Sequence, residues 1–313
     1  MSDKKILLTD GLHEDGQAIL RTAALVDDRK GIPTKDLLDI VPKYEALIVR
    51  SRTKVTPQVF EKGKNLKVIG RAGAGVDNID LAAANQHGVT VVNAPLSTNQ
   101  AVAELALGFL LALARSIPWA DATMKSGQWL KTELEGVEIN GKVLGLIGMG
   151  SIGSALARKV AALGMLIIGY DLYLSPEDIR LRGAEPVKLD ELYAQSDFIS
   201  LHIPLSPETR NLINGQTLGH MKRGVRLVCT ARGGIIDETA LLGALESGQV
   251  AGAALDVFAK EPPGLTALVS HPHVIATPHI GAQTDEAQAR AAVDIANEVL
   301  AALLGKPLRW KIV

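Results

Sequence analysis

The decisive stretch of this 313-residue chain is Lys142-Val-Leu-Gly-Leu-Ile-Gly148-Met-Gly150-Ser-Ile-Gly153-Ser-Ala-Leu-Ala-Arg-Lys-Val160. An apolar run of strand length leads into glycines spaced G-x-G-x-x-G, and a helix-like segment follows at once. Gly148 permits a tight turn, Gly150 lets bare backbone approach a pyrophosphate, and Gly153 lets helix and strand pack closely. The helix start offers unpaired N–H groups to the anion. Glycine-rich turns also arise for packing alone, so the neighbouring sequence decides between the two interpretations.

The next apolar run supports a dinucleotide site. Met165-Leu-Ile-Ile-Gly-Tyr170 is typical of a buried strand, and it ends on Asp171. An acidic side chain there accepts hydrogen bonds from a ribose diol and would repel a 2′-phosphate. The following residues, Leu172-Tyr173-Leu174, include no Arg or Lys to bind such a phosphate. The pattern therefore predicts NAD rather than NADP.

Composition limits the class of protein. Hydrophobic residues make up 47% and charged residues 21%, and a chain of this length is expected to form about two domains. The net charge of −1 provides no global field for nucleic acid, and a single cysteine, Cys229, excludes an internal disulfide. No signal-peptide pattern precedes Lys4, and the apolar segment 101–114 is too short to span a bilayer. We expect a cytoplasmic location and no nucleic-acid or membrane partner.

The first hundred residues alternate strand and helix patterns, including a helix expected over Gly16–Leu25. Repeated βα units with continuous apolar strands imply a parallel sheet covered by helices. The segment 99–117 is apolar nearly all round and predicts a buried helix, and residues 119–129 continue helical. The final amphipathic helix, 286–304, is expected to return to the first domain.

Polar residues follow three predicted strands of the first domain, where ligands of parallel sheets bind. These strand ends carry Arg50-Ser51-Arg52, Arg71-Ala-Gly73-Ala74-Gly75 and Asn93-Ala-Pro95. Arginines beside a bare-backbone turn and an amide would hold a small anion. Solvated arginines at strand ends are the alternative.

Three turns after strands of the second domain carry the reactive side chains. They are Ala231-Arg232-Gly-Gly-Ile-Ile-Asp237, Leu255-Asp256-Val-Phe258 with Glu261, and Thr277-Pro-His279-Ile-Gly281. Because each follows an apolar strand, all three are expected to meet at one edge of the sheet, near the nicotinamide end of a bound dinucleotide.

These residue types suit hydride transfer at a carbinol carbon beside a carboxylate. Arg232 has the planar fork that holds a carboxylate, and His279 can take up or release the hydroxyl proton near neutral pH. Glu261 would bind the other imidazole nitrogen, fix its tautomer and favour the imidazolium.

Each of these residues also has a structural alternative. An isolated Arg is usually exposed, and a His after Pro is often a hydrogen-bonded turn residue. His271-Pro-His273 has the spacing of two metal ligands but lacks a third nearby, so we predict no metal site. Cys229 lies in an apolar strand without a basic neighbour, which favours a buried thiol over a nucleophile.

Several stretches together resemble the D-isomer-specific 2-hydroxyacid dehydrogenases. They are Arg71-Ala-Gly-Ala-Gly-Val-Asp-Asn-Ile-Asp80, Gly148-Met-Gly-Ser-Ile-Gly153, Ala231-Arg-Gly-Gly-Ile-Ile-Asp237, Ala254-Leu-Asp-Val-Phe258 with Glu261-Pro262, and Pro278-His-Ile-Gly281. The resemblance covers nearly the whole chain. It implies an α/β fold of two doubly wound parallel-sheet domains, a Rossmann NAD domain at 99–286 inserted into a flavodoxin-like substrate domain formed by 1–98 and 287–313. It also implies a homodimer through the nucleotide domains.

The resemblance assigns roles residue by residue. It makes Arg232, Glu261 and His279 catalytic and gives substrate contacts to Arg50, Ser51, Arg71, Gly73, Asn93, Arg232 and His279. The residues expected to contact NAD are Ala74, Gly148, Gly150, Ser151, Ile152, Gly153, Asp171, Ile203, Thr230, Ala231, Arg232, Asp256, His279 and Gly281.

Within the family, the runs 47–51, 224–226 and 252–258 favour members that act on a phosphorylated substrate. We expect NAD-dependent oxidation of 3-phospho-D-glycerate to 3-phosphohydroxypyruvate, the first step of serine biosynthesis. The alternatives are another D-2-hydroxyacid dehydrogenase, such as a glyoxylate or hydroxypyruvate reductase, and a non-catalytic NAD-sensing scaffold. Cys229 stands where the family commonly has Asn, which leaves a local hydrogen bond open. Because the sequence ends at Val313, we expect no serine feedback through a further C-terminal domain.

Overall fold

The computed structural model describes residues 4–313, so the first three residues of the predicted 1–98 segment lie outside it. The chain forms two compact units, one running to Asn99 and resuming at Ala282–Val313, the other Gln100–Gly281. The second unit ends at Gly281 rather than at residue 286. The reason is local: Gln283 accepts a hydrogen bond from Arg50, and Gln288 donates to the Ala282 carbonyl, so this turn belongs to the first unit.

The first unit is built on a parallel sheet with strand order β2-β1-β3-β4-β5. Its strands are β1 (Lys5–Leu8), β2 (Leu25–Asp28), β3 (Ala46–Val49), β4 (Val68–Arg71) and β5 (Thr90–Asn93). Its helices are α1 (Glu14–Arg21), α2 (Thr34–Ile40), α3 (Pro57–Lys62), α4 (Leu81–Gln86) and α12 (Asp285–Leu303), with a 3₁₀ turn at Val41–Lys43. This strand order is the flavodoxin-like one that we expected.

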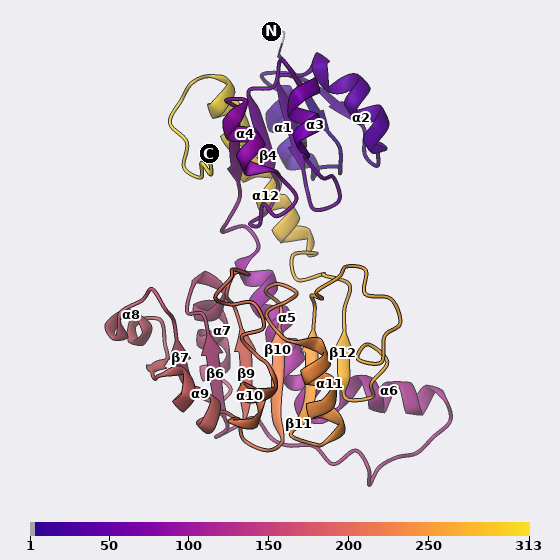
Figure 1. Cartoon of the computed structure of the whole chain (residues 1–313), viewed down its shortest axis with the longest axis vertical. Helices are drawn as coiled ribbons and strands as arrows, with labels where there is room; N and C mark the ends of the chain where they lie inside the picture. Colours follow the sequence, from indigo (N-terminus) through magenta and orange to yellow (C-terminus); the bar gives the residue numbers. More distant parts are fainter. Residues whose placement is uncertain (1–3) are drawn as a thin grey trace. The chain divides into compact units, whose positions relative to one another are not determined.

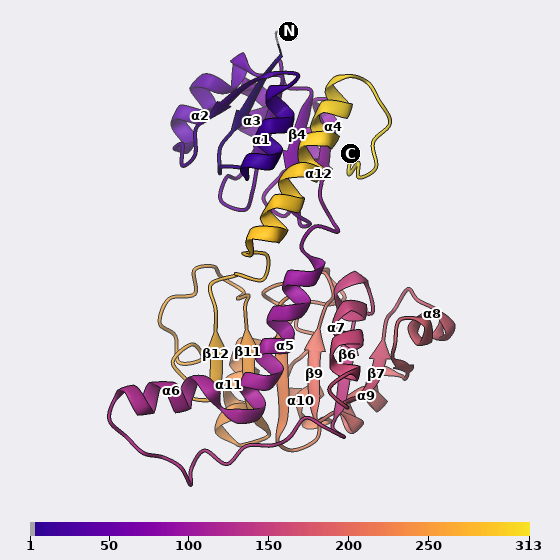
Figure 2. The same cartoon turned by 180° about the vertical axis from the view of Figure 1, so that it is seen from behind.

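Strand alternation divides the apolar side chains of this unit into two layers. Leu7 of β1 joins the cluster formed with α2, α3 and α4, whereas its neighbours Ile6 and Leu8 join the cluster formed with α1 and α12. Figures 1 and 2 show the two sets of helices on opposite faces of the sheet. The sheet is therefore covered on both sides, as its continuous apolar strands require.

The second unit has a parallel sheet with strand order β12-β11-β10-β9-β6-β7-β8. Its strands are β6 (Val143–Ile147), β7 (Leu166–Tyr170), β8 (Glu185–Pro186), β9 (Phe198–Leu201), β10 (Val225–Cys229), β11 (Val250–Leu255) and β12 (Val274–Ala276). The chain moves outward from β6 to β7, then returns to pair β9 with the other side of β6. The switch point beside β6 is where a doubly wound sheet binds its ligand.

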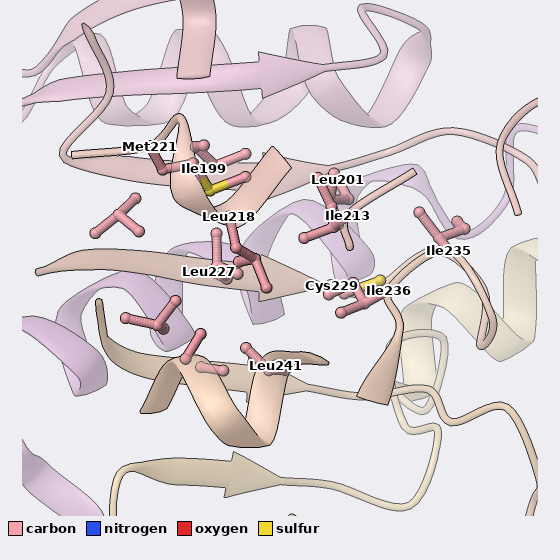
Figure 3. Packing of buried hydrophobic residues seen from close by; sticks show 14 of the residues in the cluster. Ile199, Leu201, Ile213, Leu218, Met221, Leu227, Cys229, Ile235, Ile236 and Leu241 are labelled. Carbon is pink, nitrogen blue, oxygen red and sulfur yellow. The ribbon is translucent and has the colours of Figure 1, made fainter. Parts of the chain in front are cut away.

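Helices cover both faces of this sheet too. They are α5 (Asn99–Arg115), α6 (Ile117–Lys125), α7 (Ser151–Ala161), α8 (Pro176–Leu181), α9 (Leu189–Gln195), α10 (Gly215–Gly219) and α11 (Glu238–Glu246). Helices α5 and α7 pack on one face, and α9, α10 and α11 on the other, where Leu218, Leu227 and Leu241 interdigitate (Figure 3). Each fully buried Leu or Ile in such a layer contributes about 1.5–3 kcal/mol.

Two expected elements were wrong in extent. The helix predicted over Gly16–Leu25 ends at Arg21, because Leu25 starts β2 and pairs with Lys5 of β1, a contact that local periodicity does not reveal. The helical pattern expected to reach Trp129 stops at Lys125, where Gly127 adopts a left-handed φ of 80°. No single helix within residues 4–313 is long and apolar enough to cross a membrane; α5 and α6 reach that limit only as a pair bent by 64°.

Candidate active site

The glycine-rich turn has the geometry that a pyrophosphate requires. Gly148 has a left-handed φ of 96°, and its N–H donates to the Tyr170 carbonyl at 2.8 Å. A Cβ on Gly153 would overlap the Gly148 carbonyl, whereas a Cβ on Gly150 would enter open space. The backbone at Gly150, the N-cap of α7, is therefore open to a ligand. The residues present fit the phosphates of a dinucleotide.

Asp171 lies beside this turn, as predicted. One carboxylate oxygen accepts the Met149 N–H at 2.8 Å, and the other accepts the Tyr173 N–H at 3.0 Å. Each oxygen of an ionised carboxylate can accept further hydrogen bonds, so both keep acceptor capacity for a ribose diol. The backbone of the turn and the strand end orient the carboxylate before any ligand binds.

The other residues predicted to contact NAD follow the strands next to the switch point. Ile203 lies against Gly148, whose Cβ would approach the Ile203 side chain at 2.9 Å. Thr230 and Ala231 follow β10, and the Oγ1 atom of Thr230 is buried without a hydrogen-bond partner among the described residues. Ser151 and Ile152 form the first turn of α7. The unpaired buried hydroxyl of Thr230 is a candidate ligand contact at this edge of the sheet.

Glu261 and His279, which we predicted as an acid/base pair, lie within hydrogen-bond distance of each other. Nδ1 of His279 lies 2.9 Å from one Glu261 oxygen, and the other Glu261 oxygen accepts the Phe258 N–H at 3.1 Å. His279 has a left-handed φ of 55°, which a non-glycine residue adopts at an energetic cost. The side chains are 46% and 38% exposed, so a substrate can reach the histidine.

Asp256 holds the strained turn that carries His279. Its carboxylate is buried and accepts hydrogen bonds from Thr277 Oγ1 at 2.6 Å, Ile280 N–H at 2.7 Å and Gly281 N–H at 2.8 Å. We predicted Asp256 and Gly281 only as contacts of NAD. In the structure Asp256 connects the end of β11 to both residues that follow His279, a positioning role that sequence reasoning missed.

The Arg232 turn packs on the Glu261 loop. A Cβ on Gly233 would overlap the backbone of Phe258 and Ala259, so the two loops are in direct contact. The Arg232 guanidinium donates to the Ala231 carbonyl at 2.7 Å. Because β10, β11 and β12 are neighbouring parallel strands, their carboxyl ends bring Arg232, Glu261 and His279 to one edge of the sheet.

Cys229 is buried, and burial raises the pKa of its thiol to about 11. The sulfur donates a weak hydrogen bond to the Arg232 carbonyl at 3.8 Å. At the position where the family commonly has Asn, the local hydrogen bond is therefore donated by the protonated thiol of Cys229. A buried thiol with a raised pKa is a poor nucleophile.

The predicted substrate residues of the first unit lie at the carboxyl ends of β3, β4 and β5. Arg50 donates to Gln283 at 3.0 Å, and burial lowers the pKa of its guanidinium against the opposing effect of Asp10. Arg71 extends over bare Gly73, which has a φ of 140°. Asn93 donates to the Ala74 carbonyl at 2.6 Å, and its Oδ1 is buried without a hydrogen-bond partner among residues 4–313. Ser51 is exposed beside Arg50.

Two residues near Arg50 were missed. Buried Asp10 accepts the N–H groups of Arg50 and Thr53, the Thr53 hydroxyl, and pairs with Arg52 at 3.2 Å. Asp10 follows β1 at the same sheet edge, so the rule used for the other strand ends would have found it. Gln283 carries no such signal, because it is distant in sequence from every strand of this unit.

The His271 and His273 side chains take part in packing. His273 meets the Trp119 ring edge to face at 5.5 Å, and the two imidazoles lie 5.6 Å apart. Within the described part of the chain, no group of three or more His, Cys, Asp or Glu residues could hold a metal ion.

Comparison with known proteins agrees with this geometry. Residues 107–281 match the family model described as "D-isomer specific 2-hydroxyacid dehydrogenase, NAD binding domain", which makes NAD the coenzyme of this unit. D-3-phosphoglycerate dehydrogenase of Synechocystis sp. is 47% identical over 305 residues, 97% of this chain and 55% of that protein. The chain thus spans about half the length of the curated relatives it matches.

Solved structures agree over almost the full chain. A glyoxylate reductase from Paecilomyes thermophila superposes with a TM-score of 0.89 at 32% identity, covering 100% of this chain and 99% of that one. D-lactate dehydrogenase from Aquifex aeolicus, complexed with NAD and lactic acid, superposes with a TM-score of 0.82 at 30% identity, covering 96% of both chains. The chain belongs to the D-isomer specific 2-hydroxyacid dehydrogenase family.

Proposed function

We propose that this chain catalyses the NAD-dependent oxidation of 3-phospho-D-glycerate to 3-phosphohydroxypyruvate, the first step of serine biosynthesis. The observation that carries the proposal is the Glu261–His279 pair at 2.9 Å, in which the loop that carries Glu261 packs against the Arg232 turn. The 47% identity to a D-3-phosphoglycerate dehydrogenase supports the substrate.

The proposed chemistry divides between coenzyme and protein. Bound NAD supplies the hydride acceptor, nicotinamide C4, for the hydrogen on C2 of the substrate. His279 takes the hydroxyl proton through Nε2 because Nδ1 faces Glu261, and the Glu261 carboxylate stabilises the imidazolium that forms. Arg232 holds the substrate carboxylate. In the reverse direction the imidazolium returns the proton to the ketone oxygen.

The phosphate of this substrate needs basic side chains. Arg50, Arg71 and Asn93 lie at the carboxyl ends of adjacent strands of the first unit, and the bare backbone at Gly73 lies beside Arg71. Guanidinium groups bind phosphate oxygens through paired hydrogen bonds. We assign the phosphate to this edge of the first unit.

The test compares substrates in an NAD-linked assay. Arg50→Ala is expected to raise KM for 3-phospho-D-glycerate by about tenfold or more, while KM for glyoxylate in the reverse reaction changes by less than about twofold. Arg29→Ala, which removes an exposed arginine paired with Asp27 in the same unit, is the matched control. Equal loss for both substrates in Arg50→Ala would contradict the assignment.

Two alternative functions predict different results in the same assays. A glyoxylate or hydroxypyruvate reductase, suggested by the structural likeness to a glyoxylate reductase, would reduce those acids and fail to oxidise 3-phospho-D-glycerate. A non-catalytic NAD-sensing scaffold would bind NADH and reduce no 2-keto acid. The Arg232, Glu261 and His279 set argues against the scaffold.

We further propose a homodimer formed through the NAD-binding unit, in the cytoplasm. Ile117 and Met124 of α6 and Trp129 beyond it are 52%, 54% and 75% exposed, so one short segment carries three large apolar side chains that the chain itself leaves uncovered. A second copy of this chain would cover them. Light scattering should give twice the chain mass, and the double change Met124→Glu, Trp129→Glu should give a folded monomer. A wild-type monomer at working concentration would contradict the dimer.

A further inference from the structure

Both polar groups of the Met149 backbone, in the middle of the glycine-rich turn, are held by charged side chains. The Met149 N–H donates to the Asp171 carboxylate at 2.8 Å, and the Met149 carbonyl accepts from the Arg182 guanidinium at 3.0 Å. Ser154 Oγ lies 3.0 Å from the same carbonyl. The Met149 side chain is fully buried, so this residue is fixed on three sides. An acid and a base thus hold the two polar groups of the residue between Gly148 and Gly150.

Arg182 reaches the turn from a different element. It follows α8, and its backbone N–H donates to the Asp178 carbonyl at 3.1 Å. The guanidinium is partly buried, and no carboxylate within residues 4–313 forms an ion pair with it inside 4 Å. Arg180, in the last turn of α8, differs in both respects, because it is exposed and pairs with Glu185 at 3.0 Å. One of the two arginines therefore retains hydrogen-bonding capacity beside the coenzyme site.

The difference between NAD and NADP lies at the ribose atom that Asp171 is placed to bind. NADP differs from NAD by a phosphate on the ribose 2′-oxygen, which is the atom that Asp171 is placed to bind. Arg182 uses one of its five N–H groups on Met149 and can offer others to phosphate oxygens. The segment 172–174 contains no basic residue. A base for a 2′-phosphate can therefore come only from elsewhere in the chain, and Arg182 is the candidate.

We propose that Arg182 is a specificity-determining residue for the coenzyme: it supports the phosphate turn while Asp171 is ionised, and it binds a 2′-phosphate once that carboxylate is removed. Exclusion of NADP then depends on Asp171 alone, because Arg182 would attract the 2′-phosphate that Asp171 repels. The proposal concerns the coenzyme end of the site and does not depend on which 2-hydroxy acid is oxidised.

The experiment is a fluorescence titration of the intact chain with NADH and NADPH, without substrate. Asp171→Ser should bind NADPH about tenfold or more tightly than wild type, and this gain should weaken with added salt. Asp171→Ser with Arg182→Gln should lose the gain, because glutamine carries no charge, while Ser154 Oγ still donates to the Met149 carbonyl. Arg182→Gln alone should weaken NADH binding by a smaller factor than the loss of NADPH affinity that the same change causes in Asp171→Ser.

Two controls separate specificity from structure. Arg180→Gln removes the neighbouring charge and should change neither dissociation constant in the wild-type or the Asp171→Ser background. Asp171→Ser with Arg182→Lys should retain most of the NADPH gain, because lysine keeps the positive charge. This variant tests the role of the charge if the glutamine variant does not fold. The proposal is overturned if the Asp171→Ser, Arg182→Gln protein binds NADPH as tightly as Asp171→Ser, or if Arg182→Gln weakens both coenzymes equally in that background.

Discussion

One carboxylate oxygen of Glu261 lies 2.9 Å from Nδ1 of His279, while the other accepts a backbone N–H of its own loop. An ionised carboxylate only accepts hydrogen bonds, so Nδ1 carries the proton and Nε2 is the free base. Glu261 is itself immobilised by the Phe258 N–H, so it fixes the imidazole in angle as well as in tautomer. In the proposed mechanism, this pair accepts the proton of the substrate hydroxyl.

Removing either member should therefore lower the rate without lowering coenzyme affinity. His279→Ala is expected to reduce kcat by about 10²–10⁴-fold, and Glu261→Gln by about 10–100-fold. The double variant should be no slower than His279→Ala, because the glutamate acts through the histidine. Steady-state kinetics with NADH titration measures these effects.

The control for this prediction is Glu238→Gln. Glu238 accepts the Ala259 N–H at 2.6 Å and holds the same loop without contacting His279. A glutamine oxygen can accept the same hydrogen bond, so kcat should stay within about twofold of wild type. A His279→Ala enzyme with near wild-type turnover would eliminate the acid/base assignment.

Asp256→Asn should affect both stability and rate. The amide nitrogen of asparagine would face N–H donors at one of the two oxygen positions, which leaves a buried donor unpaired and costs about 1–3 kcal/mol. The His279 turn would then relax from its left-handed backbone, and kcat should fall. Urea unfolding and kinetics on the same protein measure the two effects together.

Thr277→Val is the graded comparison, because valine has the shape of threonine and removes only the hydroxyl bond to Asp256. It should cost about 1 kcal/mol and leave most of the activity. If Asp256→Asn were as stable and active as wild type, the carboxylate would not hold the turn.

The glycines of the phosphate turn should separate binding from folding. Gly150→Ala places a methyl group in open space and should lower the free energy of unfolding by less than about 1 kcal/mol. It should raise the NADH dissociation constant by about tenfold or more, because the methyl group lies where the pyrophosphate approaches the backbone.

Gly153→Ala should instead destabilise the fold by about 1–3 kcal/mol, since its Cβ would overlap the Gly148 carbonyl. Gly219→Ala, in α10 with open space around it, is the control, which should keep NADH affinity and lose no stability. NADH titration and thermal unfolding distinguish the three variants, and unchanged NADH affinity in Gly150→Ala would place the phosphates elsewhere.

His202 should make stability depend on pH. Burial beneath the glycine-rich turn lowers its pKa from 6.5 to about 4, and its Nδ1 is buried without a hydrogen-bond partner among the described residues. Above pH 6.5 the imidazole is neutral in both states. As the pH falls from 6.5 to 4 the unfolded chain binds a proton that the folded chain does not, so the free energy of unfolding falls by about 3 kcal/mol.

Urea midpoints between pH 7.5 and pH 4, spaced at about half a pH unit, measure this loss. His202→Asn should flatten the curve, whereas His220→Asn, at an exposed position, should leave it unchanged. A His202→Asn curve as steep as that of wild type would assign the pH dependence to other groups.

Sequence reasoning was most successful where a property is local. A strand followed by glycines and a helix can form only a few turn geometries, so the spacing of Gly148, Gly150 and Gly153 was enough to assign each glycine its own role. The strand-end rule placed Arg232, Glu261 and His279 at one sheet edge for the same reason, because the carboxyl ends of parallel strands share an edge whatever their order.

Hydrogen bonds between loops that are distant in the chain could not be predicted from the sequence. The Asp256 bonds to residues after His279, the Asp10 bonds to Arg50 and Thr53, and the Arg182 bond to Met149 all join segments whose proximity depends on strand order and loop packing. The left-handed backbone of His279 is of the same kind, because histidine adopts this conformation more often than most non-glycine residues but still too rarely for residue type to predict it.

The sequence by itself determined the two parallel-sheet units, the dinucleotide turn and the candidate site residues at the strand ends, because apolar periodicity and glycine spacing act over a few neighbouring residues. Only the tertiary structure decided how those side chains are held, since a buried carboxylate or guanidinium selects its partners by distance in space and not by distance along the chain.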